Sequence, residues 1–174
     1  TLANFYTNKN YFINAMDSGS LDKLFDMCDS LNIAVKIFTP DTCYTRDKKL
    51  YEGGINLITT KYTRKMKYSI NYELVDDMHS LNSLDNVIKA VIIESDIPKL
   101  LSIRDKINEN IPDLKAVQSN WNCIDINNKS VSKGNALVKY AEMLNIKPEE
   151  IIAFGDSENE VSMIKAAGLG VAVS

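Results

Sequence analysis

A short polar stretch between an expected strand and an expected helix is the part of this sequence best suited to chemistry. Residues 151–163 read IIAFGDSENEVSM, in which an apolar strand is predicted to end at Gly155 and a helix to begin soon afterwards. Asp156 then lies at the rim of a sheet, with Asn159 and Glu160 on the opening turn of the helix. In a parallel sheet, ligands bind at the carboxyl ends of the strands. Two carboxylates, an amide and a helix N-terminus therefore predict a site for a hard cation and an anionic group.

A lysine upstream of this stretch is a second candidate. The sequence VSKGNAL places Lys133 and Gly134 at the start of the preceding helix, with Ser132 as its expected cap. A lysine ammonium can neutralise a bound anion or bridge to neighbouring carboxylates. A plainer interpretation stays open at this point, in which Asp156 caps the next helix, Glu160 is a favourable first-turn charge and Lys133 is an ordinary solvated lysine.

These residues belong to a run of short alternating elements after Asn127. The expected elements are a helix at 134–144, a strand at 151–154, a helix at 158–167 and a strand at 170–173. Alternating strands and helices with tight glycine joints are typical of a parallel, doubly wound sheet. Since such sheets usually have five or six strands, this stretch predicts only part of one. We expect a boundary between two domains near residues 127–129.

The preceding residues show a helix, strand, strand order that roughly recurs. The expected elements are a helix at 20–31, strands at 33–39, 42–46 and 87–94, a helix at 97–110, and strands at 114–118 and 123–126. Residues 47–84 have no sustained period, contain a Gly53-Gly54 break and a basic segment at 61–67, and are left without a predicted structure. The sequence thus predicts an α/β protein, with an α+β domain at 1–127 and a partial doubly wound parallel-sheet core at 128–174.

Charge and composition restrict the partners of the chain. Its 174 residues carry a formal net charge of -3 at pH 7, so they lack the positive field that attracts nucleic acids. No apolar run approaches the roughly 20 residues that cross a bilayer, and the N-terminal TLANFYTNKN lacks the order of a signal peptide. Cys28, Cys43 and Cys123 are far apart, which argues against a disulfide framework or a zinc site and predicts reduced, mostly buried thiols in a cytoplasmic protein. The sequence does not determine the oligomeric state.

Two further residues have side chains that could serve a binding site. His79, the single histidine, lies in the acidic context DDMHS and is predicted to be a surface residue. Trp121, just before the last strand of the first domain, either faces a ligand or serves in packing. The basic segment at 61–67 is interpreted as a solvated face.

The sequence of residues 131–173 resembles a known family. It reads VSKGNALVKYAEMLNIKPEEIIAFGDSENEVSMIKAAGLGVAV and is similar to the C-terminal part of Cof-type phosphatases of the haloacid dehalogenase superfamily, in which a Lys-Gly start, an IKPEEIIAFGD strand and an acidic GDxxND loop recur in this order. The preceding segment resembles the α/β cap of that family, which closes over the active site and selects the substrate. The resemblance implies a magnesium-dependent phosphatase for small phosphorylated metabolites such as sugar phosphates.

The resemblance also implies roles for individual residues. In this family an aspartate attacks phosphorus, a second aspartate two residues later acts as acid and base, and Mg²⁺ neutralises charge. Asp156 would be a catalytic metal ligand, Lys133 would steady the phosphate and the nucleophile, and Asn159 would contact phosphoryl oxygens or order the loop. Glu160 takes a metal-site position where the family has aspartate, and its additional methylene is expected to alter or remove a water-mediated contact with Mg²⁺.

The nucleophile motif of the family is absent from these residues. Neither Asp-x-Asp-Gly-Thr nor the following Thr-Gly-Arg type motif occurs, and Asp41 and Asp125, which follow expected strands, lack the second aspartate. We therefore expect a fragment, cut at both ends, that does not hydrolyse phosphate esters alone. Two interpretations stay open: part of an enzyme, or a non-catalytic module that binds phosphorylated ligands without turnover. An Asp-x-Asp-Gly-Thr motif upstream of Leu21 in the parent reading frame would distinguish them. An unrelated doubly wound domain would need a glycine-rich phosphate loop or an early acidic pair, which the sequence lacks.

Overall fold

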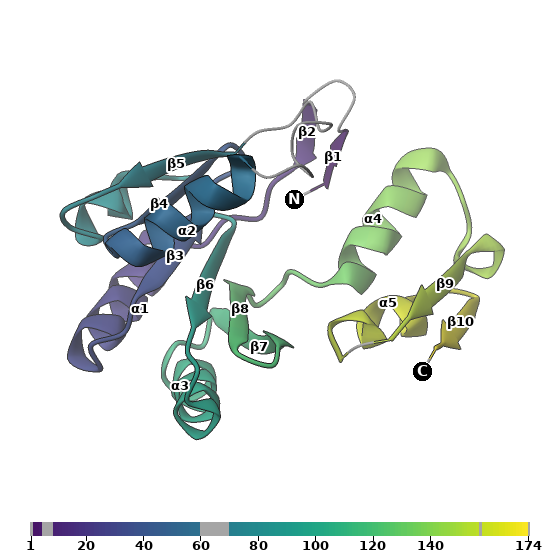
Figure 1. Cartoon of the computed structure of the whole chain (residues 1–174). Helices are drawn as coiled ribbons and strands as arrows, with labels where there is room; N and C mark the ends of the chain where they lie inside the picture. The colour runs from purple at the N-terminus through teal and green to yellow at the C-terminus, as the bar shows by residue number, and fades with distance from the viewer. Residues whose placement is uncertain (1, 5–8, 60–69, 157, 174) are drawn as a thin grey trace.

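The computed structural model describes residues 2–4, 9–59, 70–156 and 158–173. The described strands form a six-stranded sheet, a two-stranded parallel sheet and an N-terminal hairpin of β1 (Leu2–Asn4) and β2 (Lys9–Phe12) (Figure 1). The predicted mixed α/β class is confirmed. No helix in the described ranges has both the length and the apolar character needed to span a membrane.

The six-stranded sheet is mostly antiparallel. Its spatial order is β5-β4-β3-β6-β8-β7, and only the β4–β5 pair is parallel. The strands are, in chain order, β3 (Val35–Phe38), β4 (Thr42–Thr45), β5 (Asn71–Leu74), β6 (Lys89–Ile93), β7 (Leu114–Asn120) and β8 (Cys123–Asn128). The prediction of a strand at 33–39 was too long, because only its central residues pair with β4 and β6.

Two helices cover one face of this sheet. They are α1 (Ser18–Ser30) and α3 (Ile97–Asn110), close to the predicted ranges. Each begins at an aspartate whose carboxylate accepts a backbone N–H of the first turn, with Asp17 bound to Ser20 N at 2.9 Å and Asp96 to Lys99 N at 3.1 Å. Because side chains alternate between the faces of a strand, one set of apolar residues meets these helices. The core they form includes Leu21, Leu24, Phe25, Val35, Ile37, Ala90, Ile92, Leu100, Ile103, Ile107, Ile124 and Ile126.

The Gly53-Gly54 pair, which we interpreted as a break, lies inside a helix. Helix α2 (Lys48–Thr59) crosses the region left without a prediction and contacts β4 and β5. A Cβ atom on Gly54 would lie 1.9 Å from the Tyr72 ring, so the glycine permits close approach of α2 to β5. Tyr72 pairs with Cys43, so these two side chains point to the same face of the sheet. The next residue, Tyr44, points to the opposite face and packs against the core that includes α1. Helix α2 therefore covers the other face of the sheet at its β4–β5 edge.

The rest of the region without a prediction contains β5 and a short 3-10 helix, η2 (His79–Ser83), which packs against α1. The basic segment at 61–67 lies outside the described residues.

The C-terminal residues form a smaller unit with a parallel sheet. Strands β9 (Ile152–Gly155) and β10 (Leu169–Ala172) pair in parallel, as the alternating pattern predicted. The helical elements are α4 (Lys133–Leu144), η3 (Pro148–Glu150), η4 (Glu158–Glu160) and α5 (Val161–Ala166). The predicted helix at 158–167 was too long as an α-helix, because its first turn is the 3-10 helix η4.

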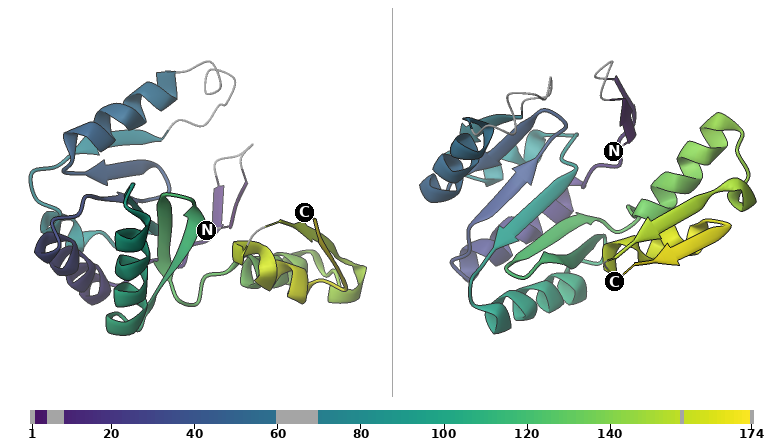
Figure 2. Two further views of the ribbon diagram at one scale, coloured as in Figure 1. Left: turned by 60° about the horizontal axis from the view of Figure 1, so that its bottom comes forward. Right: turned by 45° about the vertical axis from the view of Figure 1, so that its right-hand side comes forward.

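The two parts of the chain lie side by side and are joined by the segment after β8 (Figure 2). The segment before α1 runs next to this connection. Asn128 Nδ2 donates to the Ala15 carbonyl oxygen at 2.9 Å, and Asn14 Nδ2 donates to Ser130 Oγ. The segment between β2 and α1 is thus hydrogen-bonded to the segment that connects β8 to α4.

Candidate functional site

The loop after β9 places Asp156 at the carboxyl end of a parallel strand. Ala153 and Gly155 are buried, and Asp156, which follows them, is exposed. Gly155 is required by a close contact, because a Cβ atom there would lie 2.7 Å from Glu160 Cβ. Glu160 therefore folds back across the end of β9, next to Asp156.

Lys133 reaches this loop from the first turn of α4. Ser132 caps that helix as predicted, with Oγ accepting the Asn135 N–H at 3.0 Å. Lys133 Nζ donates to Glu160 Oε1 at 2.6 Å and to Asn159 Oδ1 at 3.3 Å. The structure thus brings together three of the four predicted site residues through their side chains.

Glu160 also connects to the fourth residue. The Asp156 N–H donates to Glu160 Oε2 at 2.8 Å, so one carboxylate holds both the lysine ammonium and the backbone at Asp156. The Lys133 ammonium is the main reason that the pKa of Glu160 lies below its ordinary value, and the Asp156 N–H adds to the effect. Glu160 is the N-cap residue of α5 but makes no side-chain capping bond. Lys133 and Glu160 are thus paired with each other, whereas the plainer interpretation has each of them separately solvated.

The donor atoms at this site fit part of a magnesium shell. Mg²⁺ prefers six oxygen ligands and is often held by one or two carboxylates together with waters and substrate phosphates. The described residues contain no group of three or more His, Cys, Asp or Glu side chains placed to hold a metal ion. Asp156 offers an exposed carboxylate at the strand end, whereas both oxygens of Glu160 already accept hydrogen bonds. The chain therefore offers oxygen ligands of the right kind but not a complete cage.

The two aspartates that follow expected strands outside this loop, Asp41 and Asp125, both accept side-chain hydrogen bonds. Asp125 Oδ2 accepts from Lys89 Nζ at 2.5 Å, and its Oδ1 accepts from Ser119 Oγ at 2.9 Å. Asp41 Oδ1 accepts from the Thr39 hydroxyl at 2.8 Å in the β3–β4 turn. Neither lies in the loop that holds Asp156.

His79 and Trp121 also lie outside this loop. His79 Nδ1 is 2.9 Å from Asp22 Oδ1, and its ring meets Phe25 edge-on, so it joins η2 to α1 as a half-exposed residue. Trp121, at the turn between β7 and β8, is 64% exposed, so it is not a packing residue within the described chain.

The three cysteines are free thiols, with Cys28 and Cys43 buried and Cys123 half-buried. Burial raises the pKa of Cys28 to about 12 and that of Cys43 to about 11, so both are protonated at neutral pH.

Sequence reasoning missed one residue beside the site. Ser162 Oγ accepts the Gly134 N–H at 3.1 Å and so connects α5 to the first turn of α4. The signal in the sequence is a small residue in the first turn of each of the two helices. This signal does not by itself predict that the helices touch there.

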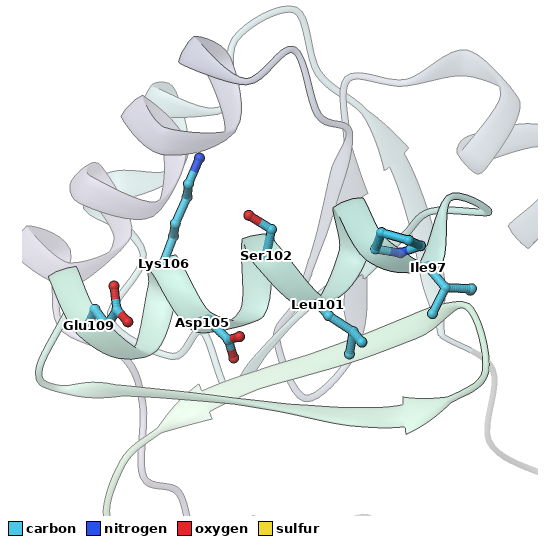
Figure 3. Close-up of a pocket in the computed structure, with 7 residues that line it drawn as sticks. Ile97, Leu101, Ser102, Asp105, Lys106 and Glu109 are labelled. Atoms are coloured by element: carbon cyan, nitrogen blue, oxygen red, sulfur yellow. The ribbon is translucent and has the colours of Figure 1, made fainter.

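A hollow of about 690 Å³ runs along α3, lined by Ile97, Pro98, Leu101, Ser102, Asp105, Lys106 and Glu109 (Figure 3). All of these residues come from one helix. Ligand pockets usually gather polar groups from several elements, so this surface is a poor candidate for a substrate site.

Comparison with known families identifies the protein class. A model of the haloacid dehalogenase-like hydrolases matches residues 1–174, the full length of the sequence. The chain belongs to this family. The match confirms the resemblance read from residues 131–173 and extends it over the six-stranded sheet.

Curated relatives of this haloacid dehalogenase-like hydrolase include phosphatases. Phosphoglycolate phosphatase of Methanococcoides burtonii is 31% identical over 105 residues, which cover 59% of this chain and 46% of that protein. Phosphatase YwpJ of Bacillus subtilis is 45% identical over 65 residues, covering 37% of this chain and 23% of that protein. The chain thus spans less than half the length of these relatives.

Solved structures share the fold. A haloacid dehalogenase-like hydrolase from B. subtilis superimposes with a TM-score of 0.75 and is 25% identical, over 95% of this chain and 64% of that chain. The arrangement described above is therefore a large part of a known hydrolase fold.

Proposed function

We propose that this chain contributes the substrate-selecting part and the late core motifs of a magnesium-dependent phosphatase for small phosphorylated metabolites, such as sugar phosphates. In this proposal residues 1–127 form the cap and residues 128–174 form the C-terminal portion of the core. The observation that carries it is the bonding of the Lys133 ammonium to Asn159 and Glu160, in the loop that follows a parallel strand. The phosphatase relatives support the same reaction class.

Each site residue has a proposed part in binding the phosphoryl group. The Lys133 ammonium, 45% exposed at the side chain, is placed to pair with phosphoryl oxygens and with a neighbouring carboxylate. Asn159 accepts a hydrogen bond from Lys133, and its proposed part is to order the loop or to contact phosphoryl oxygens. Asp156 is the proposed metal ligand, and Glu160, whose two oxygens are engaged, acts next to the metal rather than as a direct ligand. Bound Mg²⁺ would supply neutralising charge for the phosphoryl group.

The proposed reaction needs a nucleophile from outside these 174 residues, because they contain no Asp-x-Asp sequence. We expect the chain alone to hydrolyse p-nitrophenyl phosphate with Mg²⁺ no faster than a protein-free control. Turnover that is lost in Asp41→Asn or Asp125→Asn would contradict this expectation and would assign the nucleophile to the larger sheet.

The deciding experiment uses the complete reading frame that contains this chain. It should encode an Asp-x-Asp-Gly-Thr sequence upstream and show Mg²⁺-dependent hydrolysis of p-nitrophenyl phosphate. Asp156→Ala should lower turnover by more than the 10- to 100-fold typical of residues that only support a metal ligand, with the fold intact by circular dichroism. Unchanged rates at saturating Mg²⁺ would remove Asp156 from the metal site.

A second candidate is a non-catalytic module that binds phosphorylated ligands. It differs from the first candidate in whether the complete reading frame encodes an Asp-x-Asp-Gly-Thr sequence. Under this alternative, the complete reading frame would lack the motif, and inorganic phosphate would still shift the NMR signals of Lys133 and Asn159 without turnover of any ester.

A further inference from the structure

The start of α4 rests directly on the start of α5. Gly134 is buried, and a Cβ atom at this position would lie 2.4 Å from the Ser162 carbonyl oxygen and 2.7 Å from its carbonyl carbon. Only a glycine allows the two backbones to come this close. The contact joins residues far apart in the sequence and lies where α4 packs against α5.

A hydrogen bond fixes the register of this contact. The first N–H groups of a helix have no partner inside the helix. In α4, the N-cap Ser132 takes the Asn135 N–H, and Ser162 Oγ takes the Gly134 N–H at 3.1 Å from the neighbouring helix. The Asn135 N–H thus has its hydrogen-bond acceptor at the start of α4 itself, and the Gly134 N–H has its acceptor in α5.

Lys133 immediately precedes Gly134, and Ser162 is two residues after Glu160. The Ser162–Gly134 contact therefore sets the separation of the two backbone positions whose side chains meet at 2.6 Å. A lysine side chain is long and flexible, so an ammonium is held in one place only if its backbone is held too. We propose that Ser162 is a positioning residue, which places the Lys133 ammonium against Glu160 and Asn159. This inference rests on the proposed function of the site and adds a residue that the family pattern in residues 131–173 does not specify.

The test observes the Lys133 ammonium by the ¹H–¹⁵N NMR signal of its ζ group in the full 174-residue chain. A held ammonium exchanges its hydrogens with water slowly. In Ser162→Ala we expect the exchange rate to rise about five-fold, the factor that corresponds to loss of one hydrogen bond of ordinary strength. Ser162→Thr keeps a hydroxyl and should restore the slow exchange.

Ser132→Ala is the matched control. It removes the cap that adjoins Lys133 but leaves the contact with α5, so the exchange rate at Lys133 should rise less than in Ser162→Ala. Equal exchange rates in Ser162→Ala and the unchanged chain would overturn the proposal, and so would an equal rise in Ser132→Ala. If Ser162→Ala does not fold, Ser162→Cys decides, since its thiol fills nearly the same space but is a weak hydrogen-bond acceptor and should raise the rate as well.

Adding inorganic phosphate and Mg²⁺ separates this inference from the proposed function. If Ser162→Ala raises the exchange rate but phosphate leaves the Lys133 signal of the unchanged chain in place, the positioning contact stands and the phosphate-binding role of the site fails. If phosphate shifts that signal in the unchanged chain and less in Ser162→Ala, both are supported.

Discussion

Glu160 shows how one residue can join the parts of a site. Its side chain crosses Gly155 and reaches the Asp156 N–H with one oxygen and the Lys133 ammonium with the other. An aspartate, the residue usual in the family that residues 131–173 resemble, is one methylene shorter. The greater length of glutamate is what lets a single carboxylate make both contacts here.

At this scale we predict that shortening Glu160 weakens the site. Glu160→Asp restores the residue usual in the family, but Lys133 and Asp156 are placed here for the longer side chain. In the protein from the complete reading frame we therefore expect Glu160→Asp to lose one of the two contacts and to lower Mg²⁺-dependent kcat/KM by about 10- to 100-fold, as for other residues that support a metal ligand. Glu149→Asp, on the exposed helix η3, is the control with the same chemical change. Equal or faster turnover in Glu160→Asp would show that the bridging geometry has no functional importance.

At the scale of elements, the two glycines of α2 allow the effect of helix propensity on stability to be distinguished from the effect of packing. Among the described residues, no atom lies within 4 Å of a Cβ atom added at Gly53, whereas Gly54 lies against the Tyr72 ring. The same substitution at adjacent positions of one helix should therefore have opposite effects.

We predict that Gly53→Ala stabilises the protein by about 0.5 to 1 kcal/mol, because alanine loses less backbone entropy in a helix. Gly54→Ala should destabilise it by about 1 to 3 kcal/mol, because the methyl group overpacks the contact with β5. Urea unfolding of the two variants measures the difference. If Gly54→Ala were as stable as Gly53→Ala, α2 could not lie this close to β5.

His79 makes the docking of η2 on α1 sensitive to pH. Its hydrogen bond to Asp22 is the main reason that the pKa of His79 is raised above its ordinary value of 6.5, and Asp26 and Asp77 act in the same direction. The imidazolium is therefore favoured in the folded state. Its contribution to stability is fully present below pH 6.5 and is lost as pH rises through the folded-state pKa.

We accordingly expect the Tm of the chain to fall between pH 6 and pH 8.5 by more than the Tm of His79→Gln falls, since glutamine can bond to Asp22 but carries no charge. Differential scanning calorimetry of both proteins gives the comparison. Parallel pH curves would mean that the His79–Asp22 pair contributes nothing to folding. The effect should be modest, because Asp22 is exposed and such pairs are screened by solvent.

At the scale of the whole molecule, the C-terminal unit leaves much apolar surface uncovered. Ile152 and Phe154 of β9 are 59% and 61% exposed, and Leu169 of β10 is 55% exposed. Parallel sheets are normally covered on both faces. Further exposed apolar residues of this unit are Val138, Tyr140, Met143, Leu144 and Ile146. Leu169 pairs with Ile152, and Phe154 lies two residues further along β9, so these three side chains form a patch on one face of the strand pair. An exposed apolar patch favours association.

We predict that the 174-residue chain self-associates through this patch as its concentration rises, and that the double variant Ile152→Thr/Phe154→Ser shifts it toward monomer. Trp121→Ser removes an equally exposed apolar side chain from the β7–β8 turn and should leave association unchanged. Sedimentation velocity over a concentration series measures the three proteins. A chain that stays monomeric throughout would contradict the prediction.

The sequence by itself determined the features that depend on neighbours along the chain. The strand, loop and helix around Asp156 lie within one short stretch, so their order and the candidate site residues could be read directly. The caps Asp17, Asp96 and Ser132 adjoin the helices that they begin, and their bonds span only three residues. The resemblance of residues 131–173 to the hydrolase family was read from the same local patterns.

Only the tertiary structure decided the features that join distant segments. A glycine pair inside a helix looks like a break until the Tyr72 ring beside Gly54 is seen, and Ser162 looks neutral until Gly134 rests on it. The bonding of Lys133 to Glu160 likewise depends on how α4 packs on α5. Packing of this kind involves residues whose proximity is set by chain folding, and no local period or propensity records it.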